Sequence, residues 1–389
     1  MKDREIFCLN NISRVGTGKF RRGYTLTDHI DNAAAVLVRS ADMHELQLPS
    51  TLRAIGRAGA GVNNIPLESC AEQGIVVFNT PGANANAVKE LVLAGLMAAS
   101  RDFVGGNVWV RENAGDPDIK RTAEKAKKNF AGVEIKGKTL GVIGLGAIGV
   151  LVANAAAALG MEVYGYDPYL SVNSAWNLSH KVRHAALTDE IYEKCDYITL
   201  HVPAADGTKG MINRESIHRM KDGVRILNFA RDILVNDEDM REALSRGKVK
   251  AYVTDFPNTA VANMPGAIVL PHLGASTEEA EDNCAVMAVE EIQDYLDNGN
   301  IRNSVNFPDV DAGICQTEGR LAILHRNIPN MLSRITSALG EANINIGNMQ
   351  NRSRGAYAYT LTDIDSPLNE EGFRNLQRIE GILRVRKVK

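Results

Sequence analysis

The chain has 389 residues, of which 44% are hydrophobic and 23% charged, a balance that is typical of globular proteins and excludes a disordered or fibrous chain. At roughly 150 residues per domain, this length predicts two or three domains. The formal net charge of −3 gives no reason to expect nucleic acid or an anionic membrane as a partner.

Cysteine spacing and the N-terminal segment bear on the compartment. The five cysteines are odd in number, and none is spaced as a C-x-x-C redox pair or a metal knuckle. We therefore expect reduced thiols in a cytoplasmic protein and no metal site. Residues 1–16 are too polar for a signal peptide, and no apolar stretch approaches the roughly 20 residues that cross a membrane.

Apolar runs alternate with helical patterns in the first part of the chain. Strands are expected at 34–38, 52–57 and 75–79, with turn-rich segments at 59–66 and 80–82 and a long apolar helix at 85–100. This βαβ order predicts a parallel sheet with helices on its faces. The polar stretch 111–128 is expected to be a surface loop or a charged helix.

A second βαβ series begins with a strand at 139–143, a glycine turn at 144–149 and an alanine-rich helix at 150–159. Further strands are expected at 162–166, 197–202, 224–229 and 250–254, and a long helix at 277–298. The fold class is therefore α/β, with doubly wound parallel sheets.

The last part of the chain changes character after an extended linker. Its pattern reads as strand 320–325, helix 330–342, hairpin strands 344–352 and 356–362, helix 369–378 and strand 382–388. That βαββαβ order predicts a small ferredoxin-like α+β domain.

The strongest local motif is Gly144-Leu-Gly146-Ala147-Ile148-Gly149, which follows a strand and opens a helix. The first glycine makes a tight turn, the second lets a pyrophosphate approach the backbone, and the third allows close helix packing. Asp167 at the end of the next strand would accept hydrogen bonds from ribose hydroxyls and repel a 2′-phosphate. The motif therefore predicts a dinucleotide site that prefers NAD to NADP.

A second group of residues follows later strands. Arg231 comes directly after the strand at 224–229, and His272 follows a short apolar run and precedes a helix. In parallel α/β sheets, ligands bind at the carboxyl ends of strands. An arginine there can clamp a carboxylate through two parallel hydrogen bonds, and a histidine can transfer a proton near neutral pH. Taken singly, a surface ion pair and a core histidine are the ordinary alternatives.

With these residues in view, the chain resembles the D-isomer-specific 2-hydroxyacid dehydrogenases over essentially its whole length. Besides the glycine motif with Asp167, the resemblance rests on these segments: Gly59-Ala-Gly-Val-Asn-Asn, Asn79-Thr-Pro-Gly-Ala-Asn, His201-Val-Pro, Ala230-Arg231 and Pro271-His-Leu-Gly-Ala-Ser-Thr. It implies a substrate-binding domain at 1–100 with 285–305, an NAD-binding domain at 101–284, a linker at 306–317 and a regulatory domain at 318–389.

The resemblance also implies roles for individual residues. Arg231 would bind the substrate carboxylate and polarise the reacting oxygen, and His272 would take the hydroxyl proton on oxidation. Besides the glycine motif and Asp167, the cofactor would be contacted by His201, Val202, Pro203, Thr208, Ala230, Asp255 and Gly274.

One departure from the family pattern concerns the glutamate that orients the catalytic histidine. The segment that starts at Asp255 contains no glutamate, and Thr259 lies nearest the expected position. Either Asp255 or Glu278 substitutes for it, or His272 works unassisted.

Substrate choice depends on cations beside the cleft. The chain is most similar to the family members that oxidise 3-phospho-D-glycerate, whose corresponding arginine lies near the substrate phosphate. Arg57 matches that arginine, with Gly59, Lys89 and Arg39 as further substrate candidates. A solvated surface position is the alternative for each cation.

The final domain resembles an ACT domain, a small ligand-binding regulatory fold. The resemblance implies that His325, Asn327 and Asn345 hold L-serine between two such domains, although Asn330 replaces a glycine usual in the motif. A purely structural dimerisation module is the alternative.

Two other functions stay open from the sequence. One is a 2-hydroxyacid or 2-oxoacid dehydrogenase whose substrate carries no phosphate, and the other is an NAD-sensing corepressor without catalytic activity. We expect a homodimer or homotetramer in either case.

Overall fold

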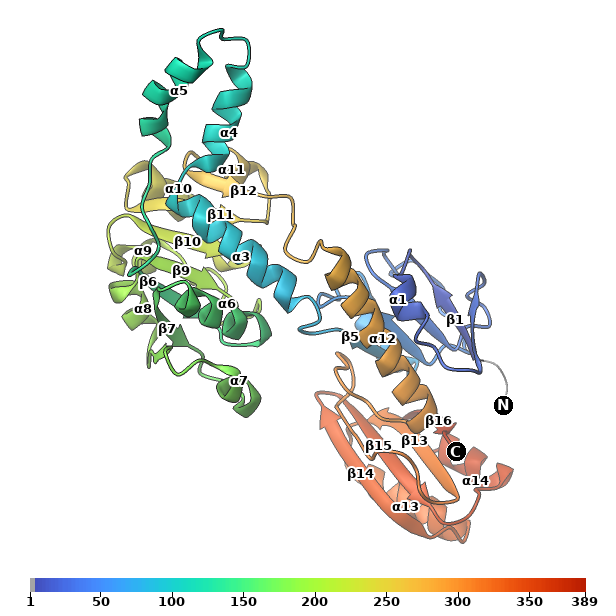
Figure 1. Cartoon of the computed structure of the whole chain (residues 1–389). Helices are drawn as coiled ribbons and strands as arrows, with labels where there is room; N and C mark the ends of the chain where they lie inside the picture. Colours follow the sequence, from blue (N-terminus) through green and yellow to red (C-terminus); the bar gives the residue numbers. More distant parts are fainter. Residues whose placement is uncertain (1–3) are drawn as a thin grey trace. The chain divides into compact units, whose positions relative to one another are not determined.

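The computed structural model describes residues 4–389 (Figure 1). Residues 1–3, which belong to the N-terminal segment and to the first expected domain, lie outside the described residues. The chain forms two compact units: Met1–Asn84 together with Glu278–Lys389, and Ala85–Thr277. Within residues 4–389, no helix combines the length and the apolar character needed to cross a membrane.

The first unit contains a five-stranded parallel sheet in the order β2-β1-β3-β4-β5. Its strands are β1 (Arg4–Cys8), β2 (Tyr24–Thr27), β3 (Ala35–Val38), β4 (Ala54–Arg57) and β5 (Val76–Asn79). Strands β1 and β2 were not among the expected elements. They lie toward one edge of the sheet and carry polar residues, so they lack the continuous apolar run of the buried strands.

Helix α12 (Glu278–Asn298) packs closely on this sheet, while α1 (Arg14–Thr17) and α2 (Leu67–Glu72) are short. A Cβ added to Gly56 of β4 would lie 2.7 Å from the Cδ1 atom of Ile292. A Cβ added to Gly16 of α1 would lie 2.4 Å from that of Ala285. Helix α12 therefore packs against β4 and against α1 at glycines that leave no space for a side chain.

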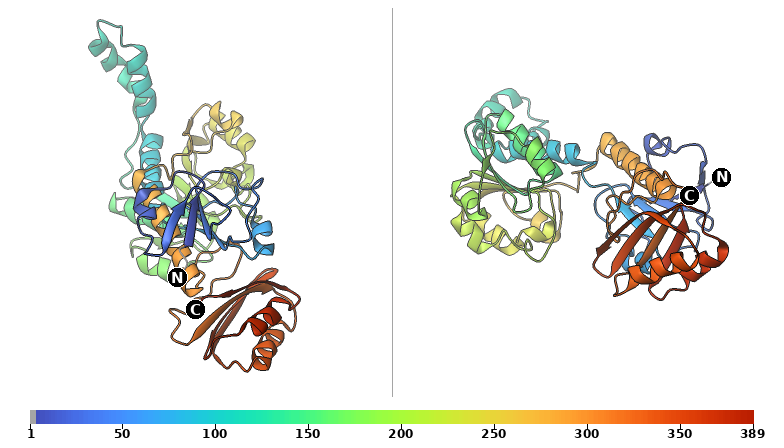
Figure 2. Two further views of the ribbon diagram at one scale, coloured as in Figure 1. Left: turned by 90° about the vertical axis from the view of Figure 1, so that its right-hand side faces the viewer. Right: turned by 90° about the horizontal axis from the view of Figure 1, so that it is seen from below.

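The tail of the first unit forms a four-stranded antiparallel sheet in the order β14-β15-β13-β16. Its elements are β13 (Gly319–Arg326), α13 (Met331–Glu341), β14 (Ile346–Arg354), β15 (Tyr357–Ile364), α14 (Glu370–Gln377) and β16 (Ile382–Lys387). Helices α13 and α14 cover one face of this sheet (Figure 2), where Leu321, Ile335 and Leu376 form part of one apolar core. The expected βαββαβ order is confirmed, and we call this part the tail domain.

The second unit contains a seven-stranded parallel sheet in the order β12-β11-β10-β9-β6-β7-β8. Its strands are β6 (Thr139–Ile143), β7 (Glu162–Tyr166), β8 (Arg183–His184), β9 (Tyr197–Leu200), β10 (Val224–Asn228), β11 (Val249–Thr254) and β12 (Ala267–Val269). The helices are α3 (Ala85–Ser100), α4 (Phe103–Glu112), α5 (Ile119–Ala126), α6 (Ala147–Ala158), α7 (Val172–Asn177), α8 (Thr188–Lys194), α9 (Arg214–Arg219), α10 (Asp237–Ser245) and α11 (Thr259–Ala262). The expected α/β fold class is confirmed.

Helices α4 and α5 form a hairpin that stands off the sheet of the second unit (Figure 1). The polar stretch 111–128 lies mostly in this hairpin and ends in a 3-10 turn at Lys127–Phe130. This stretch was expected to be either a surface loop or a charged helix, and α5 is a charged helix.

The boundaries between the two units differ from the domain boundaries expected from the sequence. Helix α3 belongs to the second unit, because a Cβ at its Gly95 would lie 3.0 Å from the ring of Phe229 at the end of β10. Helix α12 belongs to the first unit over its whole length, including residues 278–284. The expected limits at 100 and 285 therefore shift to 84 and 278, since packing against a sheet, and not position in the sequence, decides membership.

Candidate active site

The site residues of the second unit occupy neighbouring strand ends. Because the sheet is parallel, the loops after its strands emerge at one edge. The loops after β7, β6, β9, β10 and β11 carry, in that order, Asp167, Gly144, His201, Arg231 and Asp255. The structure thus brings the dinucleotide motif and the catalytic candidates into a single row.

The glycine turn is built as the motif predicts. Gly144 has a φ of 94°, and a Cβ there would lie 2.5 Å from the His201 carbonyl oxygen. A Cβ on Gly149 would lie 1.9 Å from the Gly144 carbonyl oxygen, whereas one on Gly146 would meet nothing within 4 Å. Helix α6 begins at Ala147, earlier than the expected residue 150, because Gly146 caps it. The open space at this helix N-terminus fits a pyrophosphate.

Asp167 lies beside this turn. Its Oδ2 atom accepts a hydrogen bond from the Leu145 N–H at 2.8 Å, and its Oδ1 atom accepts one from the Tyr169 N–H at 2.8 Å. Each carboxylate oxygen keeps a further lone pair. The side chain is therefore oriented by the backbone while it can still accept hydrogen bonds from ribose hydroxyls.

His201 follows β9 as a neutral imidazole. Its Nε2 atom lies 3.0 Å from the Thr199 hydroxyl, and its Nδ1 atom has no hydrogen-bond partner within residues 4–389. Burial lowers the pKa of His201 to about 3, because the charged ring would lose its hydration. The loop after it is closed by Thr208, whose hydroxyl donates to the Pro203 carbonyl at 2.6 Å. A neutral ring with an unused nitrogen at this edge fits a cofactor contact.

Arg231 is positioned by a buried amide that the sequence reasoning missed. The Nδ2 atom of Asn228 donates to the Arg231 carbonyl at 2.8 Å, and its Oδ1 atom accepts from the Ala230 N–H at 3.2 Å. The Arg231 side chain is exposed and makes one hydrogen bond to the described chain, from Nη1 to the Ala230 carbonyl. Its other donors are available to a ligand. The sequence signal that could have revealed this role is an asparagine at the end of a buried strand, two residues before Ala230.

His272 has an unusual backbone conformation, with a φ of 49°. Its N–H donates to the backbone carbonyl of Asp255 at 2.9 Å, and its ring packs against Phe256 with centroids 5.1 Å apart. A left-handed conformation costs energy for a residue other than glycine, and such strain concentrates at functional sites. The Phe256 ring, which the sequence reasoning did not single out, packs against the exposed His272 imidazole and restricts its orientation.

Asp255 forms hydrogen bonds with the turn that contains His272. Its Oδ2 atom accepts from the Gly274 N–H at 2.8 Å, and its Oδ1 atom is buried without a partner in the described chain. Burial raises the pKa of Asp255, although the Gly274 N–H and His272 each oppose that shift. Thr259, at the position of the absent glutamate, starts α11. Of the two expected substitutes, Asp255 lies in the unit of His272, whereas Glu278 belongs to the first unit.

Three of the four substrate candidates lie in the first unit. Arg57 ends β4, and a Cβ on Gly59 would lie 1.5 Å from its Nη1 atom, so only a glycine leaves room for this guanidinium. Arg39 forms an ion pair with Glu281 at 2.7 Å. Lys89 lies on α3 of the second unit, with its amino group 3.5 Å from Glu90.

Comparison with known proteins agrees with this arrangement. Residues 93–274 match the model of the D-isomer specific 2-hydroxyacid dehydrogenase, NAD binding domain. A D-3-phosphoglycerate dehydrogenase of Haemophilus influenzae is 30% identical over 86% of this chain and 81% of its own length. The chain belongs to the D-isomer-specific 2-hydroxyacid dehydrogenase family. The second unit contains its NAD-binding domain.

Other relatives of this chain are longer than the region that they share with it. A D-3-phosphoglycerate dehydrogenase of Methanocaldococcus jannaschii is 35% identical over 77% of this chain, but the match covers 57% of its own length. The chain spans about half the length of several such curated relatives. An NAD⁺-bound 3-phosphoglycerate dehydrogenase of Entamoeba histolytica is 26% identical, with a TM-score of 0.61 over 78% of this chain and 99% of that one.

The three residues expected to bind a regulatory ligand do not meet within one tail domain. His325 is 2% exposed, and its ring nitrogens contact the Thr360 hydroxyl at 2.9 Å and the Arg326 carbonyl at 2.8 Å. Asn327 donates to the Gly355 carbonyl at 3.1 Å. Strand pairing places Asn345 at the opposite end of the sheet, roughly 20 Å away at about 3.3 Å per residue.

Proposed function

We propose that this 2-hydroxyacid dehydrogenase oxidises 3-phospho-D-glycerate to 3-phosphooxypyruvate with NAD, the first step of the phosphorylated route to L-serine. The observation that carries the proposal is the row of strand ends that joins the dinucleotide turn to Arg231 and, through Asp255, to His272. The relatives named above support the choice of substrate.

In this proposal the substrate carboxylate binds the exposed guanidinium of Arg231, which also polarises the reacting oxygen. An imidazole nitrogen of His272 accepts the proton of the 2-hydroxyl group. When NAD is bound, it supplies the hydride acceptor. The backbone at Gly146, at the start of α6, would hold the pyrophosphate, and Asp167 would accept hydrogen bonds from the ribose hydroxyls. The other residues that would contact the cofactor are His201, Val202, Pro203, Thr208, Ala230 and Gly274.

The proposed phosphate contacts are Arg57 and Lys89. Arg57 ends β4 with its Nη1 atom close to the Gly59 backbone, and a guanidinium binds a phosphate through paired, charge-assisted hydrogen bonds. Arg39 is the weaker candidate, because its ion pair with Glu281, at 2.7 Å, is closer than the 3.5 Å pair of Lys89 with Glu90. The proposal therefore ranks Arg57 and Lys89 above Arg39.

An NADH fluorescence assay tests the proposal against its alternatives. We expect turnover with 3-phospho-D-glycerate and NAD, and much slower turnover with D-lactate and D-glycerate. Equal rates on the unphosphorylated acids would favour a different 2-hydroxyacid or 2-oxoacid dehydrogenase. NAD binding without turnover of any acid would favour the NAD-sensing corepressor. Comparable kcat/KM values with NADP would contradict the role of Asp167.

Regulation by L-serine is the second part of the proposal. Strand β14 is an edge strand, and antiparallel pairing of two such edges would bring Asn345 of one tail domain toward His325 and Asn327 of the other. The proposed assembly is accordingly a homodimer or homotetramer of a cytoplasmic enzyme. Millimolar L-serine should lower activity, and Asn345→Ala should relieve that inhibition without changing kcat. Calorimetry that finds no serine binding to the oligomer would leave the tail domain as an assembly module.

A further inference from the structure

A cavity lies within the first unit, and its lining includes none of the residues assigned to catalysis. Its volume is about 410 Å³, a size common for small-molecule sites. It opens where the segment before β4 meets the tail domain. The polar side chains that line it are Ser50 and Arg53 from that segment, and Glu370, Arg384, Arg386 and Lys387 from α14 and β16.

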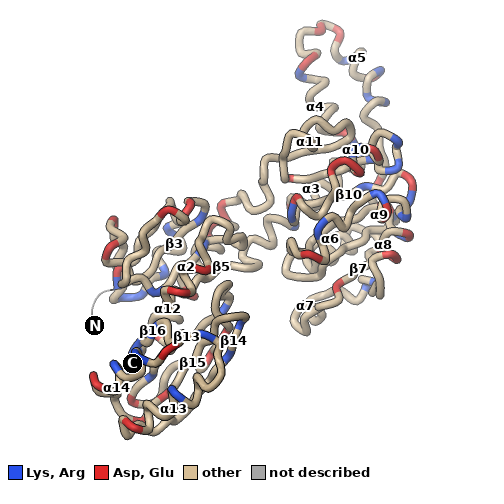
Figure 3. The backbone as a smooth tube through the Cα atoms, turned by 180° about the vertical axis from the view of Figure 1, so that it is seen from behind, with Lys and Arg blue, Asp and Glu red and all other residues tan. Residues whose placement is uncertain are grey.

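The charges around this cavity are unbalanced. Lys387 pairs with Glu370 at 2.8 Å, which leaves three guanidinium groups. Within residues 4–389, no carboxylate forms an ion pair with Arg53, Arg384 or Arg386. Figure 3 marks the basic residues of β16 in blue. Burial and the neighbouring arginines together lower the pKa of Arg53 and of Arg384. An anion would relieve this repulsion.

Arg386 adds an unsatisfied donor. Its side chain is 7% exposed, lies 4.3 Å from the centre of the Tyr295 ring, and donates to the Leu296 carbonyl at 3.2 Å. Its Nε atom is buried and has no hydrogen-bond partner in the described chain. Its Nη1 atom donates to the Tyr295 carbonyl at 3.5 Å, so Arg386 contributes mainly its positive charge to the cavity wall.

Arg384 and Arg53 come from the two sides of the cavity. Arg384 donates to the backbone carbonyls of Leu52 and Ser50, so β16 is fastened to the segment that carries Arg53. Arg53 itself is exposed at the cavity and makes no hydrogen bond or ion pair to the described chain through its side chain. Its donors are thus available to a ligand held between the two parts.

We propose that this cavity, which we call the arginine pocket, binds a small oxyanion with at least two negative charges. Guanidinium groups bind phosphate and carboxylate groups through paired, charge-assisted hydrogen bonds. Arg53 holds the anion from the side of the five-stranded sheet, and Arg384 and Arg386 hold it from the tail domain. Bound anion therefore stabilises the packing of the tail domain on that sheet.

Calorimetric titration with inorganic phosphate at constant ionic strength tests the pocket. We expect saturable binding to the wild-type protein, and Arg53→Gln and Arg384→Gln should each weaken it by about tenfold, the change expected from one charge-assisted hydrogen bond. Arg14→Gln is the matched control, since it makes the same charge change on α1 of the same unit. Arg231→Gln should keep this binding, which separates the pocket from the proposed catalytic site.

Thermal unfolding provides the second readout. At one phosphate concentration, the Tm of the wild-type protein and of Arg14→Gln should rise by more than that of Arg53→Gln. Arg53 is exposed, so its substitution leaves the fold intact. Repeating the titration with citrate shows whether phosphate or polycarboxylate ligands bind more tightly. The pocket is overturned if Arg53→Gln and Arg384→Gln bind phosphate like the wild type, if Arg14→Gln weakens binding equally, or if only Arg231→Gln abolishes it.

Discussion

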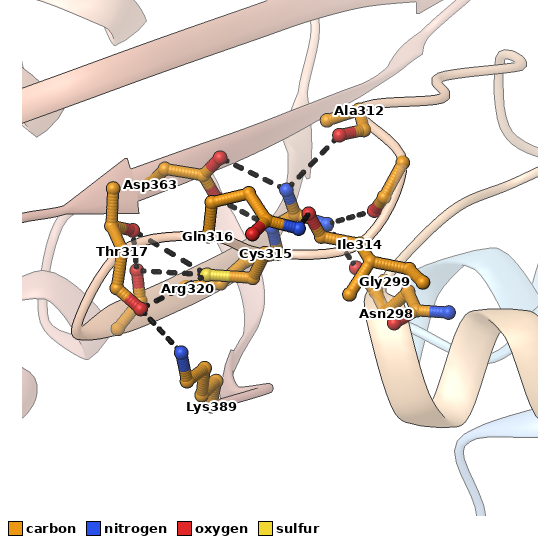
Figure 4. Close-up of polar contacts among 12 residues, drawn as sticks. Asn298, Gly299, Ala312, Ile314, Cys315, Gln316, Thr317, Arg320, Asp363 and Lys389 are labelled. Atoms are coloured by element: carbon orange, nitrogen blue, oxygen red, sulfur yellow. Dashed lines mark hydrogen bonds and ion pairs between the residues drawn. The ribbon is translucent and has the colours of Figure 1, made fainter.

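Arg320 and Arg231 carry the same side chain in two parts of the molecule with opposite surroundings. Arg320, on β13, is fully buried, and its Nη2 atom donates to the Asp363 carboxylate at 2.9 Å. Its Nε atom donates to the same carboxylate. The Nη1 and Nη2 atoms also donate to backbone carbonyls of the linker and of the end of α12, those of Asn298, Ala312 and Gly313 (Figure 4). Arg231 is exposed, with one hydrogen bond to its neighbour's carbonyl.

The contrast separates a structural arginine from a ligand-binding one. A buried guanidinium must satisfy all its donors inside the protein, and Arg320 does so by joining the tail domain to the linker and to α12. An exposed guanidinium at a sheet edge keeps donors for a substrate. The same reasoning assigns Arg53 of the arginine pocket to the second class, since its side chain is exposed and makes no hydrogen bond or ion pair to the described chain.

The largest effect is expected on the turnover rate, at His272 in the proposed catalytic site. His272→Ala should lower kcat by roughly 10²–10⁴-fold, the contribution typical of a general acid or base. NADH binding, measured by fluorescence, should be nearly unchanged, because His272 lies beyond the dinucleotide turn. A variant that keeps most of its kcat would remove His272 from proton transfer.

The next largest effect is expected at the buried arginine. Arg320→Met leaves the Asp363 carboxylate buried without its partner, which should cost about 3–5 kcal/mol of the free energy of unfolding. Chemical denaturation measures this loss. Arg320→Met combined with Asp363→Leu should recover most of it, since removing both charges also removes their desolvation cost. A single variant as stable as the wild type would contradict the structural role of Arg320.

Arg231→Lys should act on the reaction and leave stability unchanged. Lysine keeps the charge but cannot present two parallel donors, so kcat/KM should fall by about 10–100-fold for every 2-hydroxy acid. The free energy of unfolding should match that of the wild type, in contrast to Arg320→Met. A change in KM for one substrate alone would indicate a specificity role instead.

The smallest effect concerns a buried carboxyl group of α12. Glu291 accepts a hydrogen bond from the Asn303 amide at 2.7 Å, its Oε2 atom has no partner in the described chain, and burial raises its pKa to about 8. The folded protein therefore holds a proton that the unfolded chain releases above about pH 4.5, so stability falls between pH 4.5 and 8. Glu291→Gln should unfold like the wild type at pH 4 and be more stable by about 1–3 kcal/mol at pH 8. An equal difference at both pH values would contradict the raised pKa.

The sequence by itself determined the elements whose signals are local. The glycine turn with Asp167, the alternation of strands and helices in the second unit, and the βαββαβ order of the tail domain all follow from residue spacing within one or two elements. Arg231 and His272 could be singled out because the end of a parallel strand is a predictable place for a ligand. The resemblance to a dehydrogenase family was inferred from the same local motifs.

Only the tertiary structure decided what distant segments do together. It assigned α3 to the second unit and paired Arg39 with Glu281. It placed the Asn228 amide on the Arg231 backbone and the Phe256 ring against that of His272. It also placed the loop before β4 beside β16 to form the arginine pocket, and put His325 and Asn345 at opposite ends of one sheet. Such contacts depend on packing and strand register between residues far apart in the chain, and the spacing of residues within a single element carries no information about either.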